Sequence, residues 1–504
     1  MKFPLFYRLF SSSFKKLLIA GSVISMVAAA CAPTTPRQSF DVQTQTEQAA
    51  QLDSISPTPL PTRPAYDPGE LVDYTVQPGD TLPALISRFN TSEAEIREAN
   101  PILPAEVTTL PPGMPMQIPI YYQPLWGSSY QILPDRLFAY GPPQVGFNTV
   151  EFVNSQPGWL KEYQGVAGGM RRSGGELVEI VATNFSISPR LLLALIEYQT
   201  QGLTNPQPPD PEDPYVLGYR SRTHPGLYQQ LLWAANLLND AFYSYRLGKL
   251  TSFEHPDGRL ERPDPWQNAA SVTLQYYFSR MMDKEDYFNA THSQGLEKTY
   301  AQLFGDPWSD STPTIPGSLQ QPELRFPFLP GKAWAYTGGP HTGWGTDQPY
   351  AAIDFAPPNV VGGCAPTDEW STAIADGTIV RTDTGVAVLD LDGDLDERTG
   401  WVIFYLHLAT KTTPPVGTSL KAGDPIGQPS CDGGKSTGTH VHIARKYNGE
   451  WVPADSPVPF NLEGWIAKNG GAPYQGQLVQ FGKIITACEC SDRLSLVQST
   501  VNIP

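Results

Sequence analysis

Four of the seven histidines in this chain lie between residues 341 and 442, in three short phrases. The phrases are Gly-Gly-Pro-His341, Tyr-Leu-His407-Leu and Gly-Thr-His440-Val-His442, and Asp354 follows the first of them closely. Imidazoles and carboxylates that leave room for one water form the ligand set of a catalytic zinc site. Two further histidines beside such a metal would transfer protons and stabilise developing charge.

Two predicted strands position these side chains. Residues two apart in a strand point to the same face, and the β-branched pattern around His440 and His442 predicts a strand from 439 to 443. His407 ends a second apolar run at 401–406. The spacing does not decide which histidine of the pair binds a metal. Unrelated buried histidines with backbone partners are the alternative, and their clustering in one segment disfavours it.

Residues 327–470 resemble the lysostaphin-type zinc endopeptidases, in the β-lytic and LasA-like branch. The likeness rests on the phrase from Trp334 to His341 and on Ala-Ile-Asp354-Phe. It also rests on the long offset between that histidine and that aspartate, which is typical of this branch.

The resemblance implies a mainly antiparallel β domain and a role for each of the five residues. Zinc is expected to be held by His341, Asp354 and His442. His407 and His440 are expected to be the catalytic histidines. Because all five positions are filled, the motif indicates an active enzyme.

Four further cysteines follow Cys31, and in an exported chain they indicate disulfides. The β-lytic branch has a bonded cysteine where Cys431 stands, and we expect Cys364 to be its partner. Cys488 and Cys490 are too close together for an easy bridge, so their connectivity stays open.

The N-terminus is typical of an exported lipoprotein. Residues 1–30 combine a basic start with an apolar stretch, as a signal peptide does. The phrase Val-Ala-Ala-Ala-Cys31 resembles a lipobox, so we expect a lipid on Cys31 that anchors the chain to the bacterial membrane, outside the cytoplasm. Ordinary cleavage is the alternative. Residues 31–71 are rich in Thr, Pro, Gln and Ser, which predicts a disordered tether.

Residues 72–121 resemble a LysM domain, a βααβ module that binds N-acetylglucosamine-containing glycans. A strand, two capped helices at apolar spacing and a second strand are predicted in that order. The resemblance implies a sugar groove between two loops. The loops consist of Gly79, Asp80, Thr81 and Leu82, and of Asn100, Pro101 and Ile102.

A Pro/aromatic connector at 122–160 leads to a helical pattern at 161–308. The second helix of that pattern resembles the lysozyme and lytic transglycosylase fold, but Gln199 stands where that family has its acid, and a neutral amide cannot protonate a glycosidic oxygen. We therefore expect a non-catalytic all-α domain that binds glycan or serves as a spacer. A glycosidase that uses Glu197 and an unrelated helical bundle are the alternatives.

A linker at 309–326 precedes the peptidase segment, and a tail at 471–504 is expected to pack on it. The acidic segment 390–397 superficially resembles a calcium loop, but its glycine is not where an EF-hand needs it. A solvated hairpin loop is the preferred interpretation.

The whole chain is therefore multidomain, with 504 residues, 51 prolines and a net charge of −16. That charge argues against nucleic acid as a partner. We expect a cell-wall zinc endopeptidase that hydrolyses peptide bonds in peptidoglycan stems or cross-bridges, targeted by its LysM module. The alternative is a non-catalytic peptidoglycan-binding regulator of a wall amidase.

Overall fold

The computed structural model describes residues 63–358, 360, 362–490 and 492–500. These residues belong to one compact unit that spans 59–504. The expected signal peptide and Cys31 lie outside the described residues. Within the described part, no helix is both long and apolar enough to cross a membrane.

The first module has the expected βααβ order. Its elements are β1 (Glu70–Thr75), α2 (Leu82–Phe89), α3 (Glu93–Ala99) and β2 (Pro115–Ile120), and the two strands pair antiparallel. The Thr81 side chain caps α2 by accepting from the Ala84 amide. Ser92 and Glu95 form a capping box at the start of α3. These caps explain why the helices start where the sequence predicts.

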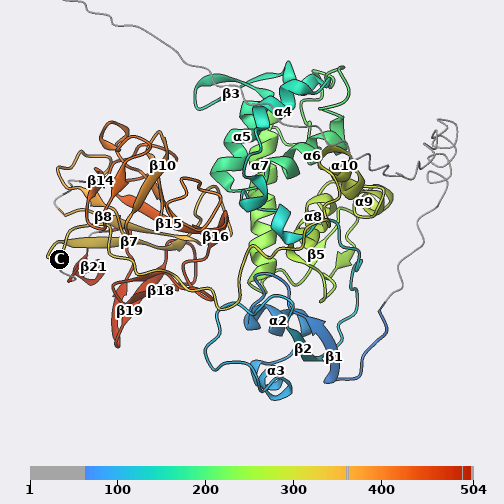
Figure 1. Cartoon of the computed structure of the whole chain (residues 1–504), viewed down its shortest axis with the longest axis horizontal. Helices are drawn as coiled ribbons and strands as arrows, with labels where there is room; N and C mark the ends of the chain where they lie inside the picture. Colours follow the sequence, from blue (N-terminus) through green and yellow to red (C-terminus); the bar gives the residue numbers. More distant parts are fainter. Residues whose placement is uncertain (1–62, 359, 361, 491, 501–504) are drawn as a thin grey trace, which may run out of the picture. The chain divides into compact units, whose positions relative to one another are not determined.

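A helical domain follows, but it begins before the expected 161–308, because η1, η2, α4 and η3 lie within the expected connector at 122–160. Two short hairpins, β3-β4 and β5-β6, are added to its helices. Its helical elements are η1 (Asp135–Leu137), η2 (Pro142–Gln144), α4 (Thr149–Ser155), η3 (Trp159–Lys161), α5 (Gly174–Phe185), α6 (Pro189–Thr200), α7 (Gly226–Arg246), α8 (Ala269–Ser279), α9 (Lys284–Ala290) and α10 (Leu296–Phe304). Its strands are β3 (Gln164–Ala167), β4 (Met170–Ser173), β5 (Phe253–Glu254) and β6 (Leu260–Glu261). The long helix α7 runs through this domain beside α5 and α8 (Figure 1).

The C-terminal region is built on an antiparallel sheet in the order β13-β10-β11-β12-β15-β8-β7-β21, with β16 paired to β15. The elements are β7 (Ala333–His341), β8 (Ala352–Ala356), β9 (Ser371–Thr372), β10 (Gly377–Asp383), β11 (Val386–Asp390), β12 (Trp401–Leu406), η4 (Thr410–Thr412), β13 (Ser419–Leu420), β14 (Pro425–Gly427), β15 (Val441–Tyr447) and β16 (Glu450–Val452). The predicted strand at 439–443 is shifted in the structure, because His440 precedes β15 and forms only a bridge to Ser430.

The C-terminal tail is part of this fold. Its elements are β17 (Asn461–Leu462), β18 (Trp465–Asn469), β19 (Gly476–Gln480), β20 (Lys483–Thr486), η5 (Arg493–Ser495) and β21 (Leu496–Gln498). Strand β19 pairs with β18, and β21 pairs with β7 at the edge of the large sheet. Leu478 and Ile485 are buried in the same core as the sheet.

Both faces of the large sheet are covered. Ile403 and Tyr405 of β12 point into the core of the peptidase region. Val402 and Phe404 alternate with them and join the core of the helical domain. This double burial explains the uninterrupted apolar run of β12. The helical domain therefore packs directly on the sheet that carries the histidine phrases.

Candidate metal centre and substrate cleft

Three neighbouring strands bring His341, Asp354 and His442 together. β8 lies between β15 and β7 in the sheet, and its Asp354 is opposite His442. Nε2 of His341 is 3.0 Å from Nδ1 of His442. Oδ1 of Asp354 is 3.3 Å from the first nitrogen and 3.2 Å from the second. All three side chains are buried, so three possible ligand atoms meet at one point.

Backbone carbonyls fix the tautomers of both imidazoles. His341 donates from Nδ1 to the carbonyl of Gly339 at 2.8 Å. His442 donates from Nε2 to the carbonyl of Gly343 at 3.1 Å. Each ring therefore turns the lone pair of its other nitrogen toward the shared point.

The two ring nitrogens and the Asp354 carboxylate oxygen that meet here are all hydrogen-bond acceptors, and none of them faces a donor among the described residues. Oδ1 of Asp354 is buried and has no hydrogen-bond partner in the described part of the chain. A buried polar atom without a partner is costly, and a cation among the three lone pairs would satisfy it. Two nitrogens and one carboxylate oxygen that leave a position open match the donor set of catalytic zinc. These residues therefore fit the metal that the sequence predicts.

The protonation states suit metal binding, because ligands must be deprotonated. Burial raises the pKa of Asp354, but the neighbouring His341 and His440 outweigh burial and hold that pKa well below its usual range. Burial lowers the pKa of His442. At neutral pH the carboxylate is therefore ionised and this imidazole is neutral.

His407 and His440 lie beside the three clustered side chains. His407 has a φ of 63° and donates from Nδ1 to the Asp432 carbonyl at 3.0 Å. His440 donates from Nδ1 to the Gly438 carbonyl at 2.7 Å, and the two rings are 4.6 Å apart. Nε2 of His440 is 3.7 Å from Oδ2 of Asp354. Burial, with His440 and His442 nearby, lowers the pKa of His407 to about 4. His407 is therefore neutral at pH 7 and offers Nε2 as a proton acceptor.

These five residues line a cleft of about 460 Å³. Its rim carries charges of both signs, Lys435 and Glu489. Tyr474 also lines the cleft, and its ring stacks on His341 with centroids 4.1 Å apart. The Gly339 amide donates to the Tyr474 carbonyl at 2.7 Å, which ties this tyrosine to the backbone that orients His341. Sequence reasoning missed Tyr474, because nothing in its local pattern marks it.

Two disulfides lie near the cleft. Cys364 is joined to Cys431, the pairing expected from the sequence, with Cα atoms 5.6 Å apart. Cys488 is joined to Cys490, although their closeness in sequence argued against an easy bridge. Cys490 lines the cleft, so this second bridge shapes its rim.

The two loops of the expected sugar groove differ in exposure. Gly79 to Leu82 are buried, whereas Pro101 and Ile102 are exposed. The Asp80 carboxylate accepts from Arg88 at 2.7 Å and from the Gln77 amide at 2.8 Å. Asn100 is also held internally, since its Nδ2 donates to the carbonyls of Ile96 and Gln117.

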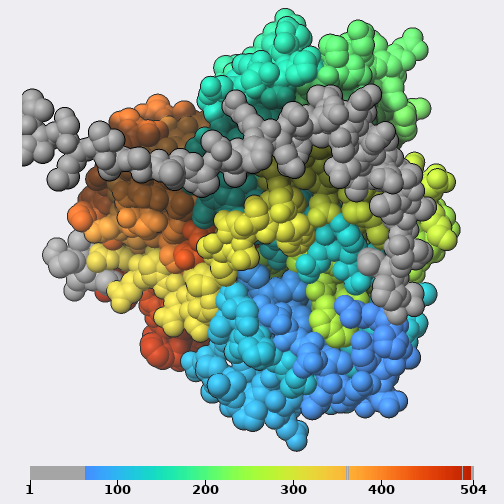
Figure 2. Space-filling model, turned by 45° about the vertical axis from the view of Figure 1, so that its right-hand side comes forward, coloured from blue at the N-terminus to red at the C-terminus, as the bar shows by residue number. Residues whose placement is uncertain are grey.

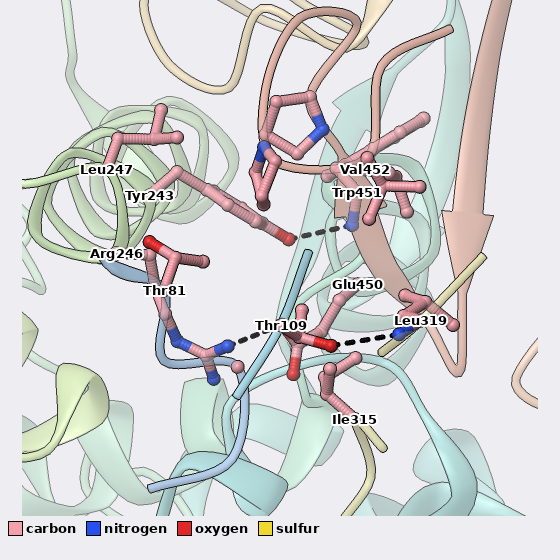
Figure 3. Close-up of a pocket in the computed structure, with 14 residues that line it drawn as sticks. Thr81, Thr109, Tyr243, Arg246, Leu247, Ile315, Leu319, Glu450, Trp451 and Val452 are labelled. Carbon is pink, nitrogen blue, oxygen red and sulfur yellow. Dashed lines mark hydrogen bonds and ion pairs between the residues drawn. The ribbon is translucent and has the colours of Figure 1, made fainter. Parts of the chain in front are cut away.

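Another part of the chain covers the buried loop. Arg246 at the end of α7 lies so close to Gly79 that a Cβ there would collide with its guanidinium. Figure 3 shows Arg246, Leu319 and Ile315 gathered around Thr81 and Thr109. In the described structure this loop faces a contact between modules.

Glu197 and Gln199 of α6 have internal partners. Glu197 accepts from the Leu203 amide at 2.8 Å and from the Thr204 hydroxyl at 2.5 Å. Gln199 donates to the Tyr277 hydroxyl at 2.9 Å. The carboxylate thus holds the turn after α6, which supports the expectation that this glutamate is not a catalytic acid.

The acidic loop after β11 has its own internal order. Asp390 is buried, and its carboxylate accepts the amides of Asp392, Gly393 and Leu395. These bonds close a tight turn and leave Asp394 exposed. The loop joins two paired strands, as a hairpin loop does, but carboxylate oxygens of Asp390, Asp392 and Asp394 also lie within 4.8 Å of one another. The choice between a solvated loop and a cation site therefore stays a prediction.

Two family models match the chain. One, described as the LasA N-terminal domain, matches residues 131–317, and the LysM domain model matches residues 74–119. The helical domain thus corresponds to the first of these models, and its likeness to lysozyme stays a prediction.

Curated relatives match parts of the chain of different length. Protease LasA of Pseudomonas aeruginosa (strain UCBPP-PA14) is 22% identical over 337 residues, which cover 64% of this chain and 74% of that protein. The β-lytic metalloendopeptidase of Lysobacter enzymogenes is 31% identical over 166 residues, which cover 31% of this chain and 86% of that protein. Among solved structures, the M23 metalloprotease pseudoalterin from the deep sea is 23% identical, with a TM-score of 0.29, and the match covers 33% of this chain and 96% of that one.

Proposed function

This chain belongs to the family of the β-lytic metalloendopeptidases, and we propose that it hydrolyses peptide bonds in the stems or cross-bridges of peptidoglycan. It is a zinc metalloendopeptidase, and we assign the zinc to His341, Asp354 and His442. This assignment rests on one observation: Nε2 of His341, Nδ1 of His442 and Oδ1 of Asp354 lie close together, and the buried carboxylate oxygen has no donor in the described structure.

The two remaining histidines have the geometry for proton transfer. When bound, zinc would act as a Lewis acid and lower the pKa of a water. His407 is neutral at pH 7 and would accept the proton of the attacking water at Nε2. The new bond joins the water oxygen to the peptide carbon, and His407 then passes its proton to the leaving amine as the C–N bond breaks. We assign His440, whose ring lies 4.6 Å from that of His407, to stabilising the oxyanion in the form that carries a second N–H at Nε2.

The LysM module supports peptidoglycan as the partner. We propose that it binds glycan through the loop that contains Pro101 and Ile102, both exposed. A second attachment point raises the effective concentration of substrate at the cleft, so weak glycan binding is enough. Action on the wall places the chain outside the cytoplasm. A lipid anchor at Cys31 stays a prediction from the sequence.

Release of new amino groups from purified sacculi tests the proposal. We expect the wild-type chain to release them and His442→Ala to lose both zinc and release, because one of three ligands is gone. His224→Ala is the matched control, since the His224 ring hydrogen-bonds to the neighbouring Ser221 and Thr223 and does not line the cleft. Activity that survives in His442→Ala would refute the assignment. Stimulation of a wall amidase without any release by the chain itself would favour the non-catalytic regulator.

A further inference from the structure

The loop between the first two proposed zinc ligands rests on helix α7 of the helical domain. The amide and the hydroxyl of Thr346 donate to Oδ1 of Asn236 at 2.7 and 3.1 Å. The amide of Gln348 donates to Oδ1 of Asp240 at 3.2 Å. Asn236 and Asp240 are four residues apart and therefore lie on the same face of α7. Two side chains of one helix thus hold the backbone of residues 342–351.

The loop backbone at Gly345 lies too close to the helical domain for any residue with a Cβ. Gly345 has a φ of 89°, and a Cβ there would lie 2.4 Å from Oδ1 of Asn236 and 2.6 Å from the ring of Phe185. At such a position glycine lets the loop backbone approach the helix without strain. The loop and the helix therefore fit each other at backbone distance.

The same loop carries the carbonyl that orients His442. Gly343 accepts from Nε2 of His442, and on its other side it lies against the Trp451 ring. Trp451 is itself held by the helical domain, because its indole N–H donates to the Phe185 carbonyl at 3.0 Å. Its backbone amide donates to the Tyr243 hydroxyl of α7 at 2.8 Å. The helical domain thus fixes both sides of Gly343.

We infer that Asn236 and Asp240 are positioning residues for the zinc site, although they lie in another module. By holding Thr346 and Gln348 they keep the Gly343 carbonyl where it receives the His442 proton. That hydrogen bond turns the Nδ1 lone pair of His442 toward the metal. The inference rests on the proposed zinc ligands, and it makes the helical domain a part of the catalytic unit.

The effect of losing Asn236 and Asp240 on zinc affinity can be estimated. Removing a group that bonds directly to a metal ligand typically weakens metal binding by 10–100-fold. Asn236 and Asp240 act one contact further away, so we expect roughly a 3–10-fold weaker zinc affinity when both are lost. The KM for substrate is expected to change little, because neither residue lines the cleft.

Zinc affinity of the full-length protein tests the inference without relying on activity. The dissociation constant is measured by competition with a chromophoric chelator, for the wild type and for the double variant Asn236→Ala/Asp240→Ala. Gln229→Ala, two turns nearer the start of the same helix, is the matched control and is expected to bind zinc as the wild type does. Asp240→Asn keeps an acceptor oxygen and is expected to retain wild-type affinity, which a merely destabilised helix would not explain.

The outcomes separate the two proposals. A folded double variant with wild-type zinc affinity would overturn the positioning role and leave the proposed function intact. A wild-type chain that binds no zinc would overturn the proposed ligand set itself. If the double variant does not fold, as judged by circular dichroism, Asn236→Ala and Asp240→Ala are measured singly, and unchanged affinity in both would again refute the role.

Discussion

At the scale of residues, the ring nitrogens divide the four histidines into two pairs. His341 and His442 turn a lone pair toward Asp354, whereas His407 and His440 face the cleft beside it. We therefore expect His407→Ala to lower kcat by about 10²–10⁴-fold while the protein keeps its zinc. Release of amino groups gives kcat, and metal analysis of the same sample gives zinc per chain. Loss of zinc would make His407 a ligand, and an unchanged kcat would remove it from catalysis.

At the scale of elements, the sequence predicted the features that follow from local periodicity, such as which residues lie in strands. Alternation in a strand at 439–443 predicted His440 and His442 on one face. Both lie near Asp354, although His440 precedes β15. The sheet order β12-β15-β8-β7 joins segments far apart in the chain, so no local pattern indicated it. The family resemblance implied only a mainly antiparallel β domain. Tyr474 and the contact of α7 with residues 342–351 depend on long-range packing that leaves no local pattern. The sequence therefore indicated the histidines and the aspartate that the structure brings together. It did not indicate that Tyr474 and helix α7 contact them or their loop.

Helix α7 and strand β16 meet in a buried charge cluster. Arg246 at the end of α7 is 3.1 Å from Asp135. It is also 3.4 Å from Glu450 of β16 (Figure 3). Burial raises the pKa of Glu450 to about 7, and Arg246 offsets only part of this. In the unfolded chain this carboxyl ionises near its ordinary pKa of about 4.5.

The stability of the folded protein should therefore depend on Glu450 and pH. Between pH 4.5 and 7 the folded state keeps the Glu450 proton that the unfolded state has lost, so stability from this group falls as pH rises. We expect Glu450→Gln to remove this fall, which is on the order of 1–3 kcal/mol. Urea unfolding of both proteins at pH 5 and pH 8 measures it. Parallel pH profiles for the two proteins would contradict the assignment.

At the scale of the whole molecule, the linker at 309–326 covers part of the LysM module. The Thr109 hydroxyl donates to the Pro316 carbonyl, and the Thr108 hydroxyl donates to the Leu319 carbonyl, both at 2.7 Å. Leu319 and Ile315 are buried at this contact. In Figure 2 the yellow linker lies along the blue and cyan LysM residues. Gly79 and Thr81 of the expected sugar groove line the same pocket as Leu319 and Arg246, so the linker and Arg246 restrict access to this loop.

A closed loop lowers the apparent glycan affinity by the fraction of molecules in which it is open. Leu319→Asp places a charge in the buried contact, so it should release the linker and tighten binding of N-acetylglucosamine oligomers by roughly 3–10-fold. Isothermal titration measures the affinity, and Gln320→Asp adds the same charge at an exposed neighbour, where no change is expected. Equal affinity in both variants would mean that sugars reach the module through the exposed loop at Pro101 and Ile102 alone. In that case the linker would serve only to hold the LysM module against its neighbours.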